Sequence, residues 1–234
     1  MAKTKTKEGN EGLDLIENPD VLASKTEEFF NQKRNQNVVF GVGGIIALLV
    51  VAYMGYQYYI NNRNQEAQEE MFQAVYYFEA DSLGKALNGD GNSYGFLDIT
   101  DFYSGTKAAN LANFYIGASY LKLGEYENAI RALKDFSADD ELVQARAYSL
   151  VGDAYMELDD FESAISWFDK ASSYNPNDEF TPAYLSKLAL AYEVNGDLSK
   201  AAATYGKIIK DYFGSTQYQD ALKHKARLEG LLVE

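Results

Sequence analysis

The sequence has no cysteine, only one histidine and only three prolines among its 234 residues. The absence of cysteine excludes disulfides, thiol nucleophiles, thiolate metal ligands and the N-terminal lipid attachment of a lipoprotein. The single histidine, His224, leaves no histidine cluster for a transition-metal site, and its lysine neighbours predict a solvated helix residue. Since no catalytic combination of residues is present, we predict that the protein is not an enzyme and uses no cofactor.

Basic residues are few beside acidic ones, with 21 lysines and arginines against 35 aspartates and glutamates. Almost all of the formal charge of −14 lies after residue 60. Nucleic-acid affinity depends on lysine and arginine contacts to phosphates, so this composition argues against a nucleic-acid partner. The acidity is consistent with solubility or with a basic protein partner. A small-molecule substrate is not expected, because no convergent polar site can be traced.

One stretch lacks charged residues altogether: residues 38–60, VVFGVGGIIALLVVAYMGYQYYI. As a helix it would be roughly 34 Å long at about 1.5 Å per residue, enough to cross a hydrocarbon core of about 30 Å. The tyrosines near its end suit the headgroup level. A core helix or a cleaved signal peptide fits less well, because the run is long and no small-residue cleavage site follows it. We therefore predict one transmembrane helix.

Flanking charge predicts the orientation of this helix. Lys25, Lys33 and Arg34 precede it closely, whereas only Arg63 follows it closely. Positive residues are enriched on the cytoplasmic side of a span, so the N-terminus is expected in the cytoplasm and the remainder outside it.

Two features of the N-terminal part carry weaker predictions. Residues 1–17 are polar and are predicted to be disordered, and Asn18–Pro19 is a typical start for a short helix to about residue 35. Inside the span, Gly43 and Ala47 form a small-x-x-x-small pair, and Gly44 extends the same smooth surface. Such surfaces allow another helix to approach, so these three residues are a hypothetical transmembrane contact.

After the span, a polar helix is expected to continue to about Leu87, followed by the turn-rich residues 88–95 and an irregular stretch to Gly105. Residues Asp90–Asp101 overlay partly on the twelve-residue calcium loop, but position 5 is a tyrosine and position 12 is not glutamate. A turn-rich connection is the favoured interpretation, and calcium binding is left open. Thr106 is predicted to cap the next helix.

Three related units follow. The first reads NFYIGASYLKLGEYENAIRAL, the second AYSLVGDAYMELDDFESAISWF, and the third AYLSKLALAYEVNGDLSKAAATY. The shared positions are Gly117/Gly152/Ala189, Tyr120/Tyr155/Tyr192, Tyr126/Phe161/Leu198, Ala129/Ala164/Ala201 and Leu133/Phe168/Tyr205. Small residues at the first and fourth of these positions allow the two helices of a hairpin to approach closely. Gly124, Asp159 and Gly196 stand where the chain reverses, which favours positive φ.

This pattern resembles the tetratricopeptide repeat. The resemblance implies an all-α solenoid, here preceded by one transmembrane helix. The expected segments are a cytoplasmic tail (1–37), the span (38–60), a linking segment that caps the solenoid or forms a degenerate repeat (61–105), three repeats (106–216) and a capping helix (217–234). That last helix is predicted to pack through Tyr218, Leu222, Leu228 and Leu231.

In this repeat fold the first helix of each unit lines a concave groove, which is the predicted site for a protein partner. The groove residues implied by the resemblance are Leu111, Phe114, Ala118, Leu121, Arg146, Ser149, Asp153, Met156, Ser186, Leu190 and Glu193. They form a mixed wall with an apolar patch at the first unit. The lysine and asparagine set that other members use to clamp a terminal carboxylate is absent, so that binding mode is not expected.

The order of tail, uncleaved span and repeat domain resembles the ancillary subunits of the bacterial SecYEG translocon, the YfgM-like family. The resemblance covers roughly residues 20–234. It implies a non-catalytic scaffold of the inner membrane whose periplasmic domain binds proteins, with SecYEG and periplasmic chaperones as partners. Two alternatives stay open: an anchored repeat protein for outer-membrane or envelope assembly, and a sensor that signals through its cytoplasmic tail.

Overall fold

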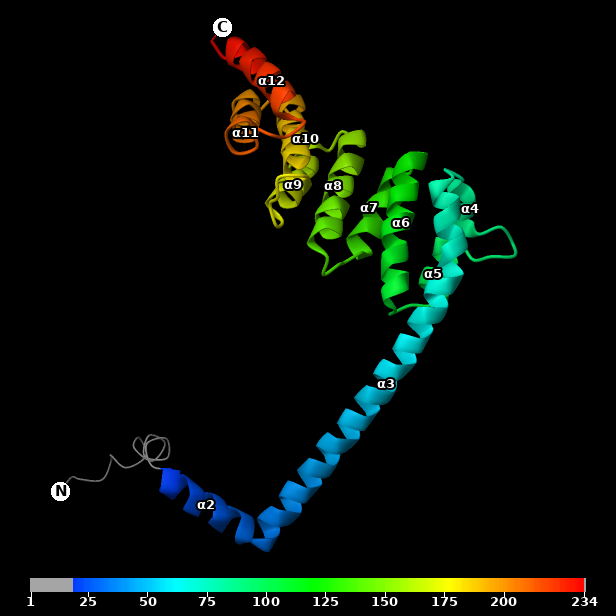
Figure 1. The fold of residues 1–234 in the computed structure, drawn as a ribbon, viewed down its shortest axis with the longest axis vertical. Helices are drawn as coiled ribbons and strands as arrows, with labels where there is room; N and C mark the ends of the chain where they lie inside the picture. The colour runs from blue at the N-terminus through cyan, green and yellow to red at the C-terminus, as the bar shows by residue number, and fades with distance from the viewer. Residues whose placement is uncertain (1–18, 234) are drawn as a thin grey trace, which may run out of the picture. The chain divides into compact units, whose positions relative to one another are not determined.

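The computed structural model describes residues 19–233, and in this range every regular element is a helix, as predicted (Figure 1). The helices are α2 (Pro19–Asn31), α3 (Lys33–Glu79), α4 (Leu83–Asn88), α5 (Phe96–Phe102), α6 (Lys107–Leu123), α7 (Tyr126–Asp135), α8 (Glu141–Glu157), α9 (Phe161–Ser173), α10 (Thr181–Val194), α11 (Leu198–Asp211) and α12 (Tyr218–Leu231). The chain forms two compact units that divide after Tyr59. The predicted disordered tail and the predicted cap at Asn18 lie outside the described residues.

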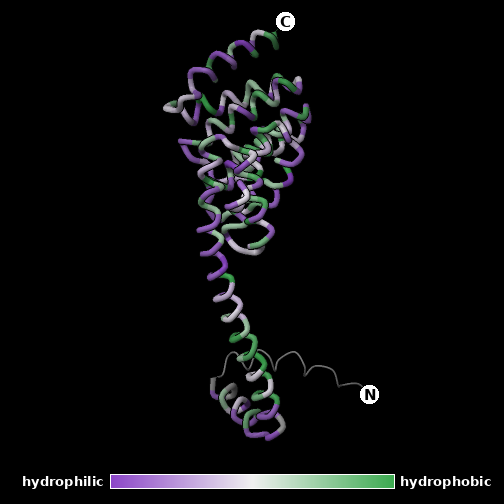
Figure 2. Tube along the Cα trace, turned by 90° about the vertical axis from the view of Figure 1, so that its right-hand side faces the viewer, coloured by the Kyte–Doolittle hydropathy of each residue, from purple (hydrophilic) through white to green (hydrophobic). Residues whose placement is uncertain are grey.

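The first unit contains the apolar part of α3. From residue 35 onward this helix is long and apolar enough to cross a membrane, by length and composition. Figure 2 shows the hydrophobic run as a mainly green stretch of the tube with paler segments between. Its large side chains, including Phe40, Leu48 and Tyr58, are exposed. Nothing lies within 4 Å of a Cβ built at Gly43 or Gly44, so the described chain leaves this small-residue surface uncovered.

The second unit begins with the polar part of α3, which ends earlier than predicted. The helix stops at Glu79, and Asp81 adopts a positive φ of 55° before α4 begins. The stretch predicted to be irregular forms α5. Its first turn is fixed by the Asp98 carboxylate, which accepts a hydrogen bond from the Gly95 N–H at 3.1 Å. Phe96 and Ile99 of α5 are fully buried, and this tertiary burial is invisible to local turn signals.

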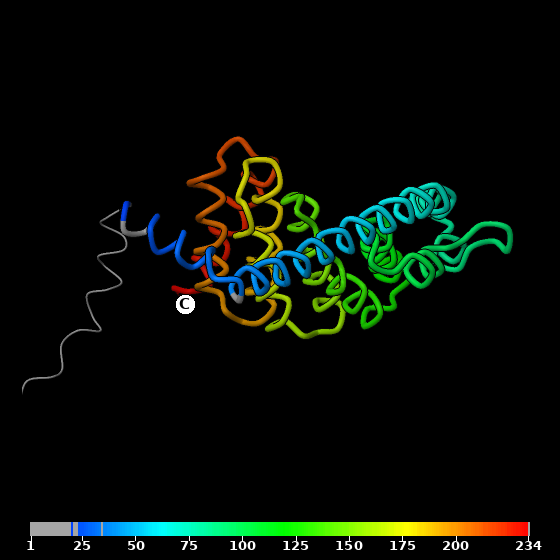
Figure 3. Tube along the Cα trace, turned by 90° about the horizontal axis from the view of Figure 1, so that it is seen from below, coloured from blue at the N-terminus to red at the C-terminus, as the bar shows by residue number. Residues whose placement is uncertain are grey.

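Three helical hairpins follow, α6/α7, α8/α9 and α10/α11, and Figures 1 and 3 show them in succession along the domain. The capping prediction is confirmed at Thr106, whose hydroxyl accepts a hydrogen bond from the Ala109 N–H. The reversals are also as predicted, since Gly124, Asp159 and Gly196 have φ of 76°, 57° and 87°. In each hairpin the backbone N–H of the residue after the reversal donates a hydrogen bond to the carbonyl of the repeated tyrosine. The N···O distance is 2.9 Å in the first hairpin, 3.0 Å in the second and 2.8 Å in the third.

The repeated small residues lie where the two helices of a hairpin meet. A Cβ built at Gly117 would lie 2.4 Å from Cγ of Leu133, and one at Gly152 would lie 2.6 Å from the ring of Phe168. The alanines at the fourth shared position, Ala129, Ala164 and Ala201, are fully buried. Close approach of the paired helices therefore explains the sequence pattern.

The ends of the repeat array are covered by the flanking helices. At one end, Met71 of α3, Leu87 of α4 and Phe96 of α5 pack with Ile116 of α6 in one cluster. At the other end, α12 packs against α11. Within α11, the buried hydroxyl of Thr204 donates a hydrogen bond to the backbone carbonyl of Lys200 at 2.8 Å.

The packing face of α12 agrees with the prediction at Leu228 and differs from it at Leu222 and Leu231. Ala221 and Leu228 are fully buried, whereas Leu222 and Leu231 are 39% and 49% exposed. The ring of His224 stacks on Tyr205 of α11, with centroids 5.1 Å apart and planes 16° apart, so this helix residue is half-buried rather than fully solvated as predicted. Leu228 packs as predicted, but the second close contact is made by Ala221, a small residue, rather than by Leu222 or Leu231.

Ser119 of α6 provides a test of the core. Its side chain is fully buried, and its hydroxyl has no hydrogen-bond partner among the described residues. A buried hydroxyl without a partner carries a desolvation cost, and alanine is the better helix former. Ser119→Ala is expected to raise the free energy of unfolding by about 1 kcal/mol, measured by chemical denaturation. A decrease of that size would show that the hydroxyl is satisfied.

Candidate functional site

A pocket of about 380 Å³ lies between α8 and α10, the first helices of the second and third hairpins. It is lined by Leu142, Val143, Arg146, Ser149, Leu150, Phe180, Ala183, Tyr184 and Lys187. Two of the predicted groove residues, Arg146 and Ser149, are therefore part of this pocket. The volume is near the lower end of the range of about 300–1,000 Å³ that ligand pockets occupy.

The walls of the pocket are mainly apolar. Leu142 at the start of α8 is 47% exposed and Phe180, just before α10, is 40% exposed. Tyr184 is buried, and this burial raises the pKa of its hydroxyl. Leu142 and Phe180 were not predicted, because they lie at the helix starts, outside the positions that the repeat pattern assigns to the groove.

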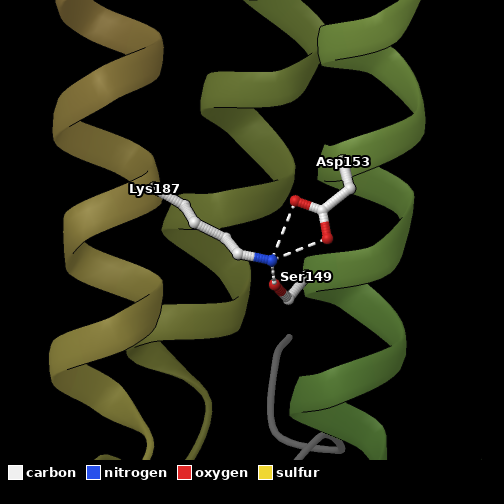
Figure 4. Close-up of polar contacts among 3 residues, drawn as sticks. All are labelled: Ser149, Asp153 and Lys187. Atoms are coloured by element: carbon white, nitrogen blue, oxygen red, sulfur yellow. Dashed lines mark hydrogen bonds and ion pairs between the residues drawn. The ribbon is translucent and has the colours of Figure 1, made fainter.

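One end of the pocket is formed by a polar cluster that joins α8 and α10 (Figure 4). The Lys187 ammonium donates to both carboxylate oxygens of Asp153, at 2.9 and 2.6 Å, and to Oγ of Ser149 at 3.2 Å. Burial raises the pKa of the Asp153 carboxyl, and the positive charge of Lys187 opposes this rise. Lys187 was not among the predicted groove residues, although opposite charges about one repeat apart are a signal that could have identified it.

Arg146 lies along the same pocket and is exposed. It takes part in none of the ion pairs found in the described part of the chain. A guanidinium offers five N–H donors in a planar fork, a geometry that matches a carboxylate. Arg146 is therefore positioned to bind a carboxylate that another molecule supplies.

The predicted apolar patch of the first hairpin is less open than expected. Leu111, Phe114 and Leu121 are half-buried and pack against a core cluster of α7 and α8. The Phe114 ring lies 5.4 Å from the ring of Phe136, which follows α7. Ala118 on the same helix is also half-buried. These contacts favour a structural role for the patch.

The remaining predicted groove residues have mixed environments. Met156 and Ser186 are half-buried, and Met156 packs against the core of the third hairpin. Leu190 is exposed. Both oxygens of Glu193 accept hydrogen bonds from Arg227 of α12 at 2.7 Å. Of this group, Leu190 presents the largest open apolar surface.

In the stretch with partial calcium-loop spacing, the carboxylates of Asp90 and Asp98 are engaged in contacts within the chain. The Asp90 carboxylate accepts hydrogen bonds from the Tyr77 hydroxyl and from the backbone N–H groups of Asn92 and Ser93, which lower its pKa to about 2. Asp98 lies within α5 and caps its first turn. No group of three or more histidine or acidic side chains suited to a metal ion occurs in the described range.

The Asp153–Lys187 pair yields a test with a pH signature. Lys187→Met would leave a largely buried carboxylate unpaired and is expected to cost about 1–2 kcal/mol of unfolding free energy at pH 7. This is less than the roughly 3–5 kcal/mol of a fully buried pair, because Lys187 is 40% exposed. Without Lys187 the pKa of Asp153 rises further above 3.8, its ordinary value. The cost should therefore shrink as the pH falls through the native pKa, since the folded state then binds the proton first.

Chemical denaturation of the variant at pH 7 and near pH 4 measures this effect. Lys200→Met is the matched control, because Lys200 pairs with Asp197 within one helix turn and is 64% exposed. Its cost should be small and nearly independent of pH. Equal costs for the two variants at both pH values would contradict the assigned role of the Asp153–Lys187 pair.

Comparison with known proteins agrees with the repeat pattern. Two family models, each described as tetratricopeptide repeat, match residues 116–179 and 184–212. No curated protein matches the chain. The matched segments run from the middle of α6 to just beyond the end of α11. Over residues 19–233 the chain is therefore all-helical, and it contains tetratricopeptide repeats together with one long apolar helix near its N-terminus.

Proposed function

We propose that this protein is a non-catalytic scaffold that is anchored in a membrane and binds other proteins through its repeat domain. Tetratricopeptide repeats indicate protein–protein interaction in general. The observation that carries the proposal for this chain is the open pocket between α8 and α10, with its exposed apolar rim and with Arg146, which forms no ion pair with the described residues. In this scheme residues 61–105 and 217–234 act as caps that keep the ends of the repeat array from associating.

The proposed location is the inner membrane of a bacterium, with residues 38–60 as the span. The exposed apolar part of α3 supports the span, because no helix of the described chain buries it. The positive residues Lys25 and Lys33 before the span support a cytoplasmic N-terminus and a periplasmic repeat domain. Protease accessibility tests this orientation: the domain should be degraded in spheroplasts and protected in inverted membrane vesicles.

For the cellular role, we propose an accessory of the Sec translocon that helps to hand exported chains to periplasmic chaperones. The support is the resemblance of this order of tail, span and repeats to the YfgM-like family. Envelope assembly and signalling through the tail are the alternatives. Gly43, Gly44 and Ala47 are the proposed contact with a partner span, since this surface is uncovered in the described chain.

A capture experiment in mild detergent tests this role. The full-length chain serves as bait, and the control bait carries an unrelated single-pass helix in place of residues 38–60, so both baits stay in the membrane. Recovery of SecY by the first bait alone would support a Sec accessory held by its span. Recovery of outer-membrane assembly factors by both baits would favour envelope assembly. Failure of both baits to recover any protein would contradict the scaffold proposal.

A further inference from the structure

The pocket between α8 and α10 carries positive charge within a strongly acidic domain. The two charged side chains among its lining residues, Arg146 and Lys187, are both basic. The whole chain, in contrast, has a formal charge of −14. A ligand with a negative group is therefore favoured at this pocket more than elsewhere on the domain.

Of these two cations, only Arg146 is available to a ligand. The Lys187 ammonium has three N–H donors, and it makes three contacts of 2.6–3.2 Å to Asp153 and Ser149. Its charge is thereby matched within the chain. Arg146 forms no ion pair within the described residues, and its exposed guanidinium can donate two hydrogen bonds to a carboxylate in a bidentate arrangement.

The apolar part of the pocket limits the size of the ligand. Leu142 and Phe180 leave large fractions of their side chains exposed, and Leu150, Ala183 and Tyr184 complete the walls. The volume of about 380 Å³ suits one large apolar side chain and its adjoining backbone. An extended segment of protein satisfies this requirement.

The acidic residues at the start of α8 limit the number of negative charges that a ligand of this pocket can carry. The loop before this helix and its first residue supply three consecutive acids, Asp139, Asp140 and Glu141. Asp140 caps the helix, because its carboxylate accepts hydrogen bonds from the N–H groups of Leu142 and Val143. A run of carboxylates on the ligand would approach this acidic end and be repelled.

We propose that this pocket binds an extended protein segment in which one large apolar side chain and a single carboxylate stand two residues apart, because side chains at i and i+2 of an extended chain lie on the same face. The apolar side chain enters between Leu142 and Phe180, and the carboxylate pairs with Arg146. This inference rests on the proposed function of the repeat domain as a protein-binding scaffold, and it specifies the chemistry of the segment that the domain selects.

Fluorescence anisotropy tests the proposal with the full chain in lipid nanodiscs and labelled, end-capped hexapeptides. The reference peptide is Gly-Phe-Ser-Asp-Ser-Gly, whose phenylalanine and aspartate lie on one face of an extended chain. The comparison peptides replace its aspartate by asparagine, replace its phenylalanine by alanine, or place two further aspartates after the first. The reference is expected to bind most tightly, and loss of its carboxylate should weaken binding about tenfold, which corresponds to about 1.4 kcal/mol.

Two variants assign this selectivity to the pocket. Arg146→Gln is expected to remove the preference for aspartate over asparagine while keeping the preference for phenylalanine over alanine. Arg131→Gln is the matched control, because Arg131 is an exposed arginine on α7 and does not line the pocket. It should change neither preference.

The outcomes separate this inference from the broader proposal. Absence of peptide binding, equal affinity for the aspartate and asparagine peptides, or selectivity that survives Arg146→Gln would each overturn the inference. The scaffold proposal would still stand if the capture experiment recovers partners equally with wild type and Arg146→Gln. The scaffold proposal fails only if neither the full-length bait nor the bait with the replaced span captures a protein.

Discussion

Gly152→Ala is expected to destabilise the repeat domain, although alanine is the better helix former by about 1 kcal/mol. The added Cβ would lie 2.6 Å from two ring carbons of Phe168. That ring is fully buried and has no free space to move into, so the overlap must shift the α8/α9 hairpin. Overpacking of this kind costs about 1–3 kcal/mol, and Gly152→Val should cost more than about 3 kcal/mol. Chemical denaturation of the full chain measures both changes.

Gly206→Ala is the matched control for this effect. Gly206 is also a helical glycine, in α11, but its added Cβ would meet only the flexible side chain of Lys225, with Cε at 3.5 Å and Cδ at 3.9 Å, which are ordinary contacts. This variant should gain stability from helix propensity. Phe168→Leu should partly rescue Gly152→Ala, and a double-mutant cycle would report that coupling. Equal effects of alanine at both glycines would show that α8 and α9 are not closely packed at Gly152.

The repeat architecture could be predicted from sequence because its determinants are local and recur. Gly117 and Gly152 mark helix crossings, and Gly124 and Gly196 mark reversals with positive φ. Each helix crossing and each reversal requires a particular residue type at one position, so both can be recognised in a single sequence. The three units reinforce one another, and the predicted packing was confirmed at Gly117 and Gly152.

The elements that were not predicted depend on distant contacts. The α5 helix has only seven residues, and its burial against α3 and α6 determines its structure. The face of α12 is determined by contacts with Tyr205 and Ile208 of α11, which bury Ala221 and Leu228 and leave Leu222 and Leu231 exposed. The Asp153–Lys187 pair joins residues 34 positions apart, about one repeat, and so forms only when consecutive hairpins stack.

Groove residues were the hardest to predict, because exposure depends on what neighbouring segments cover. The repeat pattern assigned Phe114 to an open wall, but Phe136 in the next connection packs against its ring. The same pattern could not identify Leu142 and Phe180, since the segments that enter α8 and α10 lie outside the repeated core. The pocket is thus formed by residues specific to this chain.

Replacing Leu111, Phe114 and Leu121 together with serine is expected to unfold the repeat domain or nearly so. All three side chains pack against the cluster that includes Leu133, Phe136 and Val151. Truncating a buried leucine or phenylalanine costs about 2–5 kcal/mol. Half-burial reduces the cost of each substitution, but the three losses of unfolding free energy together still approach the total stability of a typical domain, about 5–15 kcal/mol. Thermal denaturation followed by circular dichroism should show a greatly lowered or absent transition.

The paired variant Leu142→Ser/Phe180→Ser distinguishes a binding surface from a core. Both side chains are large and substantially exposed at the rim of the pocket, so their loss should change the unfolding free energy by no more than about 1 kcal/mol. It should nevertheless abolish binding of the phenylalanine-containing peptide, because it removes the apolar contact on both sides of the pocket. The opposite pattern, in which the triple variant stays folded and alone loses its partner, would place the binding surface on α6, as the sequence pattern predicted. Since stability and binding respond in opposite ways at the two sets of residues, one pair of measurements decides which helices the partner contacts.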